Sequence, residues 1–421
     1  MNSQANSQEL SPKIALVYDR VNTAYGGAEK VLLALQKAFP QAPLYTSVYH
    51  KKRAFWAKNF DVRTSFLQKF SFAKKYHRCC VAFMPLAFES LDLSNFDVVI
   101  SITSAEAKGV ITNSKQLHIC YLLTPTRYLY SHRQQYLDSK KIFKIKTIRF
   151  LAKKILDYLN TWDQVASSKP DLIIPISNLI AKRCKKYYRR QAEKLIYPPV
   201  GINKKDLISN SAKNKKKQAQ ALKKLLSARL KSKLNITNFQ YFLVLSRLVP
   251  YKKIDLAIKA CLELKKNLII VGDGPEKNNL EKIVKQYQES GNVQHGAKII
   301  FLGHTKQKDI ALLFQYCQAL LMPGIEDFGI TALEANAYGK PVIINQESGA
   351  AELILNKKHG LHLKKETSQE LISCLKNIEK YSFNTKELKK NAAKYGTTIF
   401  IRRFRKFVKL AWQKKNKNKG E

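Results

Sequence analysis

Two basic residues flank a stiff turn in the second half of the chain. Arg247 and Lys252 stand five positions apart, on either side of Pro250, and follow directly on the apolar run 241–246. A guanidinium can donate two parallel hydrogen bonds to phosphate oxygens, and an ammonium adds a compact positive charge. In a lysine-rich chain such a pair is a moderate indication by itself. Its place after an expected strand favours a phosphate-binding loop.

A loop that contains Glu326 follows the apolar run 319–322, and Glu334 stands eight positions further on. The pattern predicts a helix that starts at Gly329 and ends at Gly339. A carboxylate in the loop can bind sugar hydroxyls, one on the helix can reach a ribose diol, and the helix start can face a diphosphate. Acidic residues are scarce in this chain, so this is its most specific pattern. The residues that we expect to face inward are Ile330, Leu333 and Ala337.

Two further glycine turns follow expected strands. Gly26-Gly27 opens a helix, where backbone N–H groups can approach an anion, although tight turns use paired glycines as often. Glu29, in the first turn of that helix, can simply complement the helix dipole. The turn Gly272-Asp273-Gly274-Pro275 lacks the third glycine of the dinucleotide fingerprint, because Lys277 stands there. This argues against a nicotinamide-dependent enzyme.

Short apolar runs alternate with helical stretches along nearly the whole chain, in two series. Such alternation predicts parallel sheets covered by helices on both faces. We therefore expect an α/β fold with two Rossmann-like parallel-sheet domains facing a central cleft, where loops after the strands meet a ligand. The expected strands are 14–18, 44–48, 98–101, 118–122, 172–176 and 195–197, then 241–246, 268–271, 299–302, 319–322 and 342–345.

The composition divides the chain into four parts. Residues 1–202 and 239–395 hold the two series of strands. Residues 203–238 are rich in lysine and poor in apolar residues, which predicts an inserted, mobile, basic connector with a possible helix at 219–234. Residues 396–421 form a basic amphipathic helix and tail. We expect the apolar face of that helix to pack on the protein, and the alternative is a helix lying in a membrane interface. The residues of that face are Phe400, Phe404, Phe407, Val408 and Ala411.

The length of 421 residues and the 45% hydrophobic content fit two packed domains. No apolar run approaches the roughly 20 residues that span a bilayer, and the polar start lacks a signal segment, which predicts a cytoplasmic protein. The seven scattered cysteines are expected to be reduced thiols. The net charge of +44 attracts polyanions. It reflects either a general lysine bias or attraction to an anionic membrane, at about 1 kcal/mol per basic residue near the surface.

Taken in order, these patterns resemble the family 4 retaining glycosyltransferases, which have the GT-B fold. The resemblance extends over nearly the whole chain. Five further segments are similar to the branch that contains bacterial O-antigen mannosyltransferases. These segments are Met84–Glu89, Ala107–Val110, Thr124–Tyr128, Trp162-Asp163 and Tyr197–Val200.

The resemblance implies roles for the matching residues. Arg247 and Lys252 would bind the donor diphosphate. Glu326 would meet the transferred sugar, assisted by backbone N–H groups near Phe328 and Gly329. It also implies that residues 1–202 face the acceptor and residues 239–395 bind the nucleotide sugar.

The remaining implied roles concern donor binding. Glu334 would bind the ribose, Gly26-Gly27 would lie near the diphosphate, and the stretch Gly303-His304-Thr305 would line the nucleobase pocket. Leu123 departs from the family pattern, because related sequences often carry at this position a histidine that touches the donor sugar. This departure leaves the identity of the sugar open.

The expected reaction moves a hexose, for which mannose is one candidate, from a nucleoside-diphosphate sugar to a glycan or lipid-linked acceptor. We expect no cofactor and no metal, because Arg247 and Lys252 supply the positive charge at the departing diphosphate. Contact with an anionic membrane is expected from the charge. Two alternatives remain: a nucleotide-sugar isomerase on the same fold, and a non-enzymatic polyanion-binding protein. No basic stripe with stacking aromatics or known reading motif indicates nucleic-acid binding.

Overall fold

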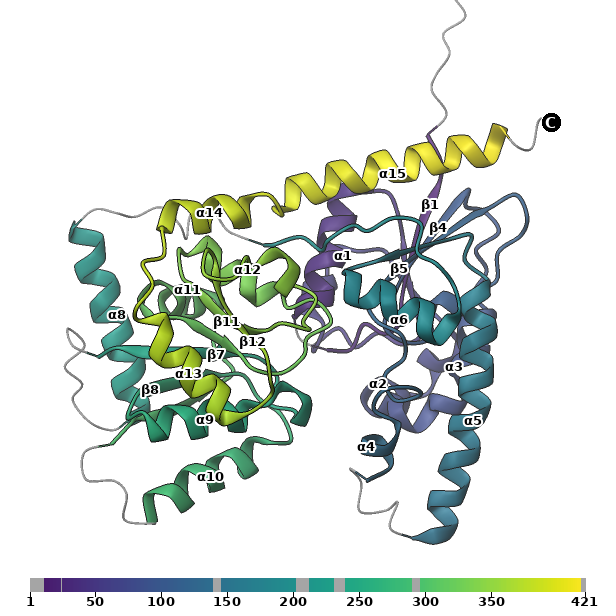
Figure 1. Ribbon diagram of the computed structural model, residues 1–421. Helices are drawn as coiled ribbons and strands as arrows, with labels where there is room; N and C mark the ends of the chain where they lie inside the picture. Colours follow the sequence, from purple (N-terminus) through teal and green to yellow (C-terminus); the bar gives the residue numbers. More distant parts are fainter. Residues whose placement is uncertain are drawn as a thin grey trace, which may run out of the picture. The chain divides into compact units, whose positions relative to one another are not determined.

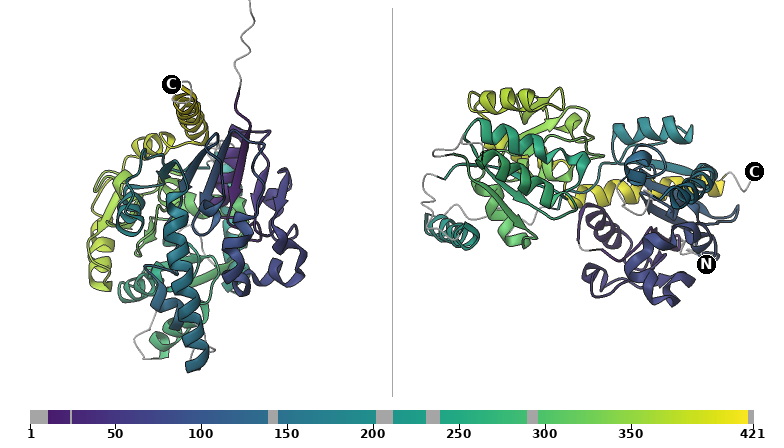
Figure 2. Two further views of the ribbon diagram at one scale, coloured as in Figure 1. Left: turned by 90° about the vertical axis from the view of Figure 1, so that its right-hand side faces the viewer. Right: turned by 90° about the horizontal axis from the view of Figure 1, so that it is seen from below.

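The computed structural model describes residues 11–23, 25–138, 145–201, 212–230, 239–289 and 296–417 (Figure 1). The chain divides into two compact units. The first unit comprises residues 1–198 and 400–421, and the second comprises residues 199–399. Each unit contains one six-stranded parallel sheet with helices on both faces (Figures 1 and 2).

The first unit is built on a sheet with the strand order β3-β2-β1-β4-β5-β6. Every residue of β4 and β5 is buried, as expected for central strands that helices cover on both faces. The strands are β1 (Ile14–Tyr18), β2 (Leu44–Thr46), β3 (Val62–Thr64), β4 (Val98–Thr103), β5 (Leu117–Leu122) and β6 (Leu172–Pro175). The helices are α1 (Gly27–Ala38), α2 (Ser71–Tyr76), α3 (Met84–Glu89), α4 (Arg133–Asp138), α5 (Lys146–Ser168), α6 (Asn178–Tyr188) and α15 (Thr397–Lys417), with 3₁₀ turns η1 (Phe55–Ala57), η2 (Phe66–Lys69), η3 (His77–Phe83) and η4 (Ala107–Gly109).

The second unit has the strand order β12-β11-β10-β7-β8-β9, again all parallel. The strands are β7 (Tyr241–Leu245), β8 (Asn267–Val271), β9 (Ile299–Gly303), β10 (Leu320–Met322), β11 (Val342–Asn345) and β12 (Gly360–Leu363). The helices are α8 (Ala212–Leu230), α9 (Ile254–Glu263), α10 (Lys277–Glu289), α11 (Gln307–Tyr316), α12 (Ile330–Ala337), α13 (Ser368–Ile378) and α14 (Thr385–Ala393), with 3₁₀ turns η7 (Pro250–Lys252) and η8 (Ala351–Leu353).

The strand order reverses once in each sheet. In the first unit the chain runs outward from β1 through β3, returns to β4 beside β1, and runs outward again to β6. In the second unit the same reversal lies between β7 and β10. At such a reversal the loops after the two strands diverge and leave room beside the carboxyl ends of the strands. Ligands of open parallel sheets bind at this point.

The predicted α/β class with two parallel sheets is confirmed, with three differences among the strands. The edge strands β3 and β12 were not predicted: β3 is Val-Arg-Thr and partly exposed, and β12 starts with glycine. The strand predicted at 195–197 is wrong. The segment is followed by Pro198 and Pro199, which have no N–H to donate to a ladder. The carbonyl of Ile196 instead accepts a hydrogen bond of 2.8 Å from the Tyr121 hydroxyl.

Part of the segment predicted as a mobile basic connector is a packed helix. α8 runs over residues 212–230, whereas a helix was expected at 219–234. Leu222 and Leu226, spaced four apart, are 1% and 0% exposed, and α8 packs beside α11 and β9 of the second unit. These two leucines tie the helix to that unit. Residues 203–211 and 231–238 of the predicted connector lie outside the described residues.

The C-terminal helix α15 packs on the first unit through the predicted apolar face. Phe400 and Phe404 are buried, and their rings lie 6.0 and 5.5 Å from the ring of Tyr121 on β5. The Arg405 guanidinium donates 2.7 Å to the carbonyl of Ala38, where α1 ends and carbonyls lack helical partners. None of the described helices combines the length and the apolar character needed to cross a membrane.

Candidate active site

The loop after β7, which carries the two predicted cations, rests on the glycine turn after β8. The amide of Ser246 donates to Val271 at 3.1 Å, and the amide of Leu248 donates to the Asp273 carbonyl at 3.0 Å. Gly272 has a φ of +128°, and a Cβ there would lie 1.9 Å from the Ser246 carbonyl oxygen. A Cβ at Gly274 would lie 2.2 Å from the Leu248 oxygen. Both positions therefore require glycine, because the backbone of the cation loop fills the space that a side chain would take.

The loop after β10, which carries Glu326, is fixed by the turn after β11. The Glu326 amide donates 3.0 Å to the Ser348 hydroxyl, and the Gly349 amide donates 2.9 Å to the Glu326 carbonyl. The Ala350 amide donates 2.7 Å to the carbonyl of Phe328, whose side chain is buried. Ser348 was not among the predicted site residues. Its signal in the sequence is only that it follows an expected strand.

The two loops meet at the reversal between β7 and β10. The Lys252 ammonium forms an ion pair with a carboxylate oxygen of Glu326, and these side chains are 10% and 16% exposed. The Lys252 nitrogen also lies 5.0 Å from the centre of the Tyr251 ring. The Tyr251 hydroxyl accepts a hydrogen bond of 3.1 Å from Arg247, which is exposed. Two cations and one carboxylate therefore share this corner of the sheet, with a net positive charge.

A small pocket lies between the carboxyl ends of the same two strands. Its lining combines apolar strand ends with the polar groups of both loops. The lining residues are Val244, Leu245, Ser246, Lys252, Leu321, Met322, Pro323, Gly324 and Glu326. A pocket of this kind, with few convergent polar groups, is a candidate binding site.

Helix α12 begins beside this pocket, at the predicted residue. Gly329 is the N-cap with a φ of +93°, and the first turn of α12 leaves backbone N–H groups without helical acceptors. Glu334 lies in the body of α12 and is buried. Leu333 and Ala337 are buried as predicted, whereas Ile330 is only partly buried. The predicted set of inward residues is incomplete, because α12 packs against β10, β11 and α14 and is also buried at Ala332, Glu334, Ala335 and Asn336.

The predicted nucleobase stretch follows β9 at the same edge of the sheet. Gly303 has a φ of +63°, and its carbonyl accepts a hydrogen bond of 3.0 Å from the Gly272 amide. His304 is exposed, and the Thr305 hydroxyl donates 3.2 Å to the Gly303 carbonyl. The structure thus places residues 303–305 next to the glycine turn that supports the cation loop.

In the first unit a buried carboxylate, Asp19, occupies the corresponding reversal between β1 and β4. One carboxylate oxygen of Asp19 accepts hydrogen bonds from the Thr103 hydroxyl at 2.6 Å and the Ala107 amide at 2.9 Å. The other accepts from the Ser104 amide at 2.8 Å. Asp19 was not predicted as a functional residue. It holds the loop after β4 against the loop after β1.

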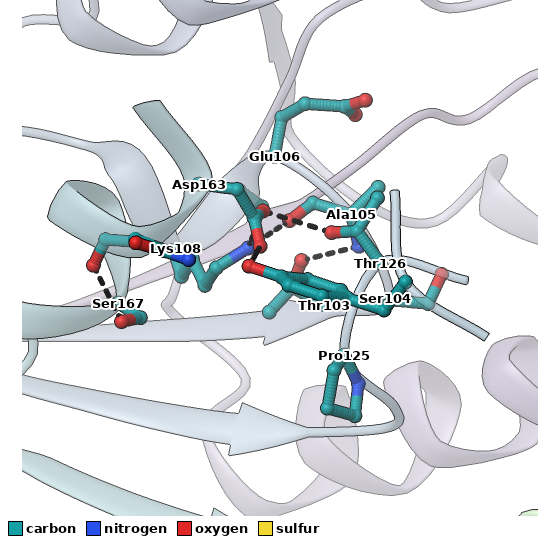
Figure 3. A network of polar contacts seen from close by, with 12 residues as sticks. Thr103, Ser104, Ala105, Glu106, Lys108, Pro125, Thr126, Asp163 and Ser167 are labelled. Carbon is teal, nitrogen blue, oxygen red and sulfur yellow. Dashed lines mark hydrogen bonds and ion pairs between the residues drawn. The ribbon is translucent and has the colours of Figure 1, made fainter. Parts of the chain in front are cut away.

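A buried ion pair lies next to this loop (Figure 3). The Lys108 ammonium and an Asp163 carboxylate oxygen are 2.5 Å apart, and each side chain is 1% exposed. The same oxygen of Asp163 accepts 2.8 Å from the Thr126 hydroxyl, and its other oxygen accepts 3.1 Å from the Tyr130 hydroxyl. Lys108 also donates 2.6 Å to the Ala105 carbonyl. The charge is therefore compensated and hydrogen-bonded, as a buried pair requires. Three of the segments that carry the family resemblance meet here.

A second buried carboxyl, Glu106, stands between the two clusters. It accepts 2.6 Å from the Tyr128 hydroxyl and lies 3.5 Å from the Arg20 guanidinium. Burial raises the pKa of the Glu106 carboxyl above its usual value, and the charge of Arg20 opposes this shift. Arg20, Glu106 and Tyr128 form a polar group. The sequence patterns did not single out Arg20 or Glu106, whereas Tyr128 ends one of the segments that carry the family resemblance.

The predicted Gly26-Gly27 pair lies at the start of α1, where Gly26 is the N-cap. The Glu29 carboxyl is buried behind it and accepts hydrogen bonds from Tyr18 at 3.2 Å and Thr23 at 3.3 Å. Burial raises the pKa of Glu29. Glu29 is thus more than a surface complement to the helix dipole. Leu123, after β5, is buried.

Comparison with known protein families finds a match within the second unit. Residues 226–397 match the family described as glycosyl transferases group 1. The chain carries a group 1 glycosyltransferase domain. The match covers the cation loop, the Glu326 loop, α12 and the loop after β9, so all of the second-unit site lies inside the domain.

Several curated relatives resemble parts of the chain. The α-monoglucosyldiacylglycerol synthase of Acholeplasma laidlawii is 28% identical over 201 residues, which is 46% of this chain and 46% of the relative. A GDP-mannose-dependent α-(1-6)-phosphatidylinositol monomannoside mannosyltransferase of Mycolicibacterium smegmatis is 30% identical over 146 residues, 32% of this chain and 37% of the relative. The chain thus spans about half or less of the length of these two relatives.

Solved structures resemble the whole chain. HepE of Anabaena, in complex with UDP-glucose, superposes with a TM-score of 0.66 at 18% identity and covers 95% of this chain and 100% of HepE. At this identity the likeness establishes the fold, which is that of GT-B glycosyltransferases. The predicted GT-B fold and the predicted glycosyltransferase family are therefore confirmed.

Proposed function

We propose that the group 1 domain serves a retaining hexosyltransferase. It moves a hexose from a nucleoside-diphosphate sugar to a glycan or lipid-linked acceptor in cell-surface polysaccharide or glycolipid synthesis. One observation carries the proposal. Lys252 and Glu326, 74 positions apart in sequence, form an ion pair at the strand reversal of the second unit, and Arg247 donates a hydrogen bond to the neighbouring Tyr251 hydroxyl.

The cation loop supplies what a departing diphosphate needs. When the bond between the sugar C1 and the diphosphate oxygen breaks, negative charge grows on the diphosphate. Arg247, Lys252 and the backbone N–H groups at the start of α12 stabilise this charge more in the transition state than in the bound donor. The loop is held by backbone hydrogen bonds and by glycine contacts, so little reorganisation accompanies the reaction. These cations make a metal ion unnecessary.

Glu326 acts on the sugar side of the same site. In the donor-free protein its carboxylate neutralises Lys252. A bound diphosphate competes for the Lys252 ammonium, and the carboxylate is then available to accept hydrogen bonds from sugar hydroxyls. The acceptor oxygen bonds to C1 on the face that the diphosphate leaves, and the acceptor proton passes to the departing diphosphate. The anomeric configuration is thereby retained.

The names of related proteins support the donor and acceptor classes. HepE was solved with UDP-glucose, and the mycobacterial relative is named for GDP-mannose, so both bases and both hexoses are candidates. The Acholeplasma relative is named as a monoglucosyldiacylglycerol synthase and the mycobacterial relative as a phosphatidylinositol monomannoside mannosyltransferase. These names and the net charge of +44 support the proposal of a lipid-linked acceptor at the inner face of the membrane.

The test compares loss of charge in the site with the same loss elsewhere in the unit. Lys252→Ala and Glu326→Ala should each lower the release of nucleoside diphosphate by 10²–10³-fold, the usual effect of removing one transition-state donor. The matched controls are Lys266→Ala and Glu379→Ala, which break an exposed ion pair of 2.6 Å in the same unit. Full activity in the two site variants, or equal losses in the controls, would refute the assignment.

A further inference from the structure

A second pocket, in the first unit, is lined almost entirely by polar and basic side chains. It has a volume of about 340 Å³ and lies beyond the carboxyl ends of β1 and β2. Three of its lining residues are lysines, and a histidine and a tyrosine stand beside them. The lining residues are Tyr49, His50, Lys51, Lys52, Gln68 and Lys74.

The pocket is fixed by backbone contacts. The Tyr49 amide donates 2.9 Å to the Gln68 side-chain oxygen, and the Gln68 amide group donates 3.1 Å to the Tyr49 carbonyl. On the other side, the buried Asn22 donates 3.2 Å to the Lys74 carbonyl. The His50 amide donates 2.8 Å to Val21, which follows β1. The segments that carry the lysines are therefore held in place, while the ammonium groups of Lys51 and Lys52 remain exposed to solvent.

The chain segment that supplies the lining of this pocket, residues 49–83, carries almost entirely positive charge. Residues 49–83 contain one acidic residue, Asp61, and it is already paired with Arg63 at 3.0 Å. The same stretch contains nine basic residues besides two histidines. They are Lys51, Lys52, Arg53, Lys58, Arg63, Lys69, Lys74, Lys75 and Arg78. An anionic partner is the complement of such a surface.

Large apolar side chains are exposed on the segment that closes the pocket. Phe70 and Phe72, between Gln68 and Lys74, are 49% and 53% exposed, and their rings lie 6.0 Å apart. Tyr76 is also exposed, with the Lys75 ammonium 5.2 Å from its ring centre. Exposed aromatic rings on the segment that links two lining residues of a basic pocket match the boundary of a bilayer, where rings enter the acyl region and cations meet the headgroups.

We propose that this surface, defined by the pocket residues together with Phe70, Phe72 and Tyr76, docks the protein on a membrane that contains anionic phospholipid. Lys51, Lys52 and Lys74 bind headgroup phosphate, and the rings of Phe70 and Phe72 insert beside it. The C-terminal helix α15 does not serve this purpose, because Phe400, Phe404 and Val408 of its apolar face are buried in the first unit. The proposal locates membrane contact on the first unit and does not depend on the donor site.

The experiment measures binding of the full chain to sedimented vesicles of phosphatidylcholine, with and without phosphatidylglycerol. The triple variant Lys51→Gln, Lys52→Gln, Lys74→Gln should lower the partition coefficient on anionic vesicles by about 100-fold, since each basic residue near the surface contributes about 1 kcal/mol. Phe70→Ser with Phe72→Ser should lower it by at least about tenfold, because the rings lose their burial in lipid.

Matched controls separate this surface from the overall charge and from exposed apolar area in general. The charge control is a triple variant of three exposed lysines of α14, Lys386→Gln with Lys389→Gln and Lys390→Gln. The apolar control is a double variant of two exposed leucines elsewhere, Leu355→Ser with Leu410→Ser. These controls should bind anionic vesicles within about twofold of the original chain. Equal losses in the controls would show attraction by net charge alone and overturn the proposal.

Two further outcomes also decide the question. If the pocket variant keeps full vesicle binding but loses binding to single-stranded RNA, the surface serves nucleic acid and the proposal is overturned. Thermal shift with UDP and GDP is measured on every variant. A retained nucleotide shift with lost vesicle binding supports the docking surface, whereas a missing nucleotide shift in the unmodified chain contradicts the proposed transferase without touching the vesicle result.

Discussion

Gly324 should be as important for the reaction as the charged residues that it separates. It stands between β10 and Glu326, and a Cβ there would lie 2.2 Å from the Tyr251 carbonyl oxygen and 2.8 Å from the Lys252 Cα. Restoring the first contact to 3.4 Å, the lower limit of ordinary contact, requires a shift of about 1.2 Å in a densely packed region. Both neighbours of the new methyl group are backbone, so no side chain can rotate away. In Gly324→Ala the loop that holds Lys252 must move away from the loop that holds Glu326.

The size of the effect follows from this displacement. Overpacking of this kind lowers the free energy of unfolding by about 1–3 kcal/mol, whereas a misplacement of about 1 Å in a catalytic site can lower the rate 10²-fold. We therefore expect kcat/KM of Gly324→Ala to fall about 100-fold, while the donor-free protein still unfolds cooperatively with its Tm only a few degrees lower.

The assay follows nucleoside diphosphate release, with the nucleotide sugar that most stabilises the unmodified chain as donor. Gly396→Ala is the control, because a Cβ there meets the Ala393 oxygen at an ordinary 3.5 Å, and it should keep at least half of the activity. If Gly324→Ala retains full activity, the cation loop is not held by the contact described here and the geometric argument fails.

Two further predictions concern the first unit. Asp163→Asn leaves the buried Lys108 ammonium without its counter-charge and should lower the free energy of unfolding, measured by urea denaturation, by about 3–5 kcal/mol. Asp157→Asn breaks the exposed pair with Arg133 and should change this free energy by less than about 1 kcal/mol. Equal losses in the two variants would contradict the burial argument. Burial lowers the pKa of His118 to about 3, against about 6.5 when unfolded, so the unfolded state binds one more proton in this window and stability falls as the pH decreases through it. Between pH 6 and 4 the unfolding free energy should fall by up to about 1.4 kcal/mol per pH unit more than in His118→Gln; parallel curves for the two proteins would show that His118 titrates normally.

Most of the strands and the loops that follow them could be predicted from the sequence, because strands such as β4 and β5 are largely apolar and helices separate them. The pairing of Lys252 with Glu326 could be anticipated only indirectly. Each residue follows an expected strand, and parallel strands end at one edge of a sheet, but the sequence does not state that β7 and β10 are neighbours. The structure shows this adjacency through the register of Leu243 with Leu320.

The sequence patterns did not predict the role of Asp19 or the packing of α8. The Asp19 carboxylate is held by hydrogen bonds from Thr103, Ser104 and Ala107, which lie more than 80 positions away in sequence. A single acidic residue after an expected strand does not indicate such partners. The basic average composition of residues 203–238 predicts a mobile connector, although α8 lies within it. Composition averages over the helix, whereas packing depends on the two leucines that share one face.

The glycine turn 272–275 shows why a motif rule and a packing rule can disagree about the same residues. Compared with the dinucleotide fingerprint, the turn is incomplete, because Lys277 occupies the position of the third glycine. The motif rule alone therefore does not assign it a function. In the structure Gly272 and Gly274 admit the backbone of Ser246 and Leu248 rather than a phosphate. Gly324 does the same for Tyr251 on the opposite side of the cation loop. The positions of Arg247 and Lys252 are thus set by glycines after β8 and β10, the two strands that flank β7. A glycine can determine a binding site without touching its ligand.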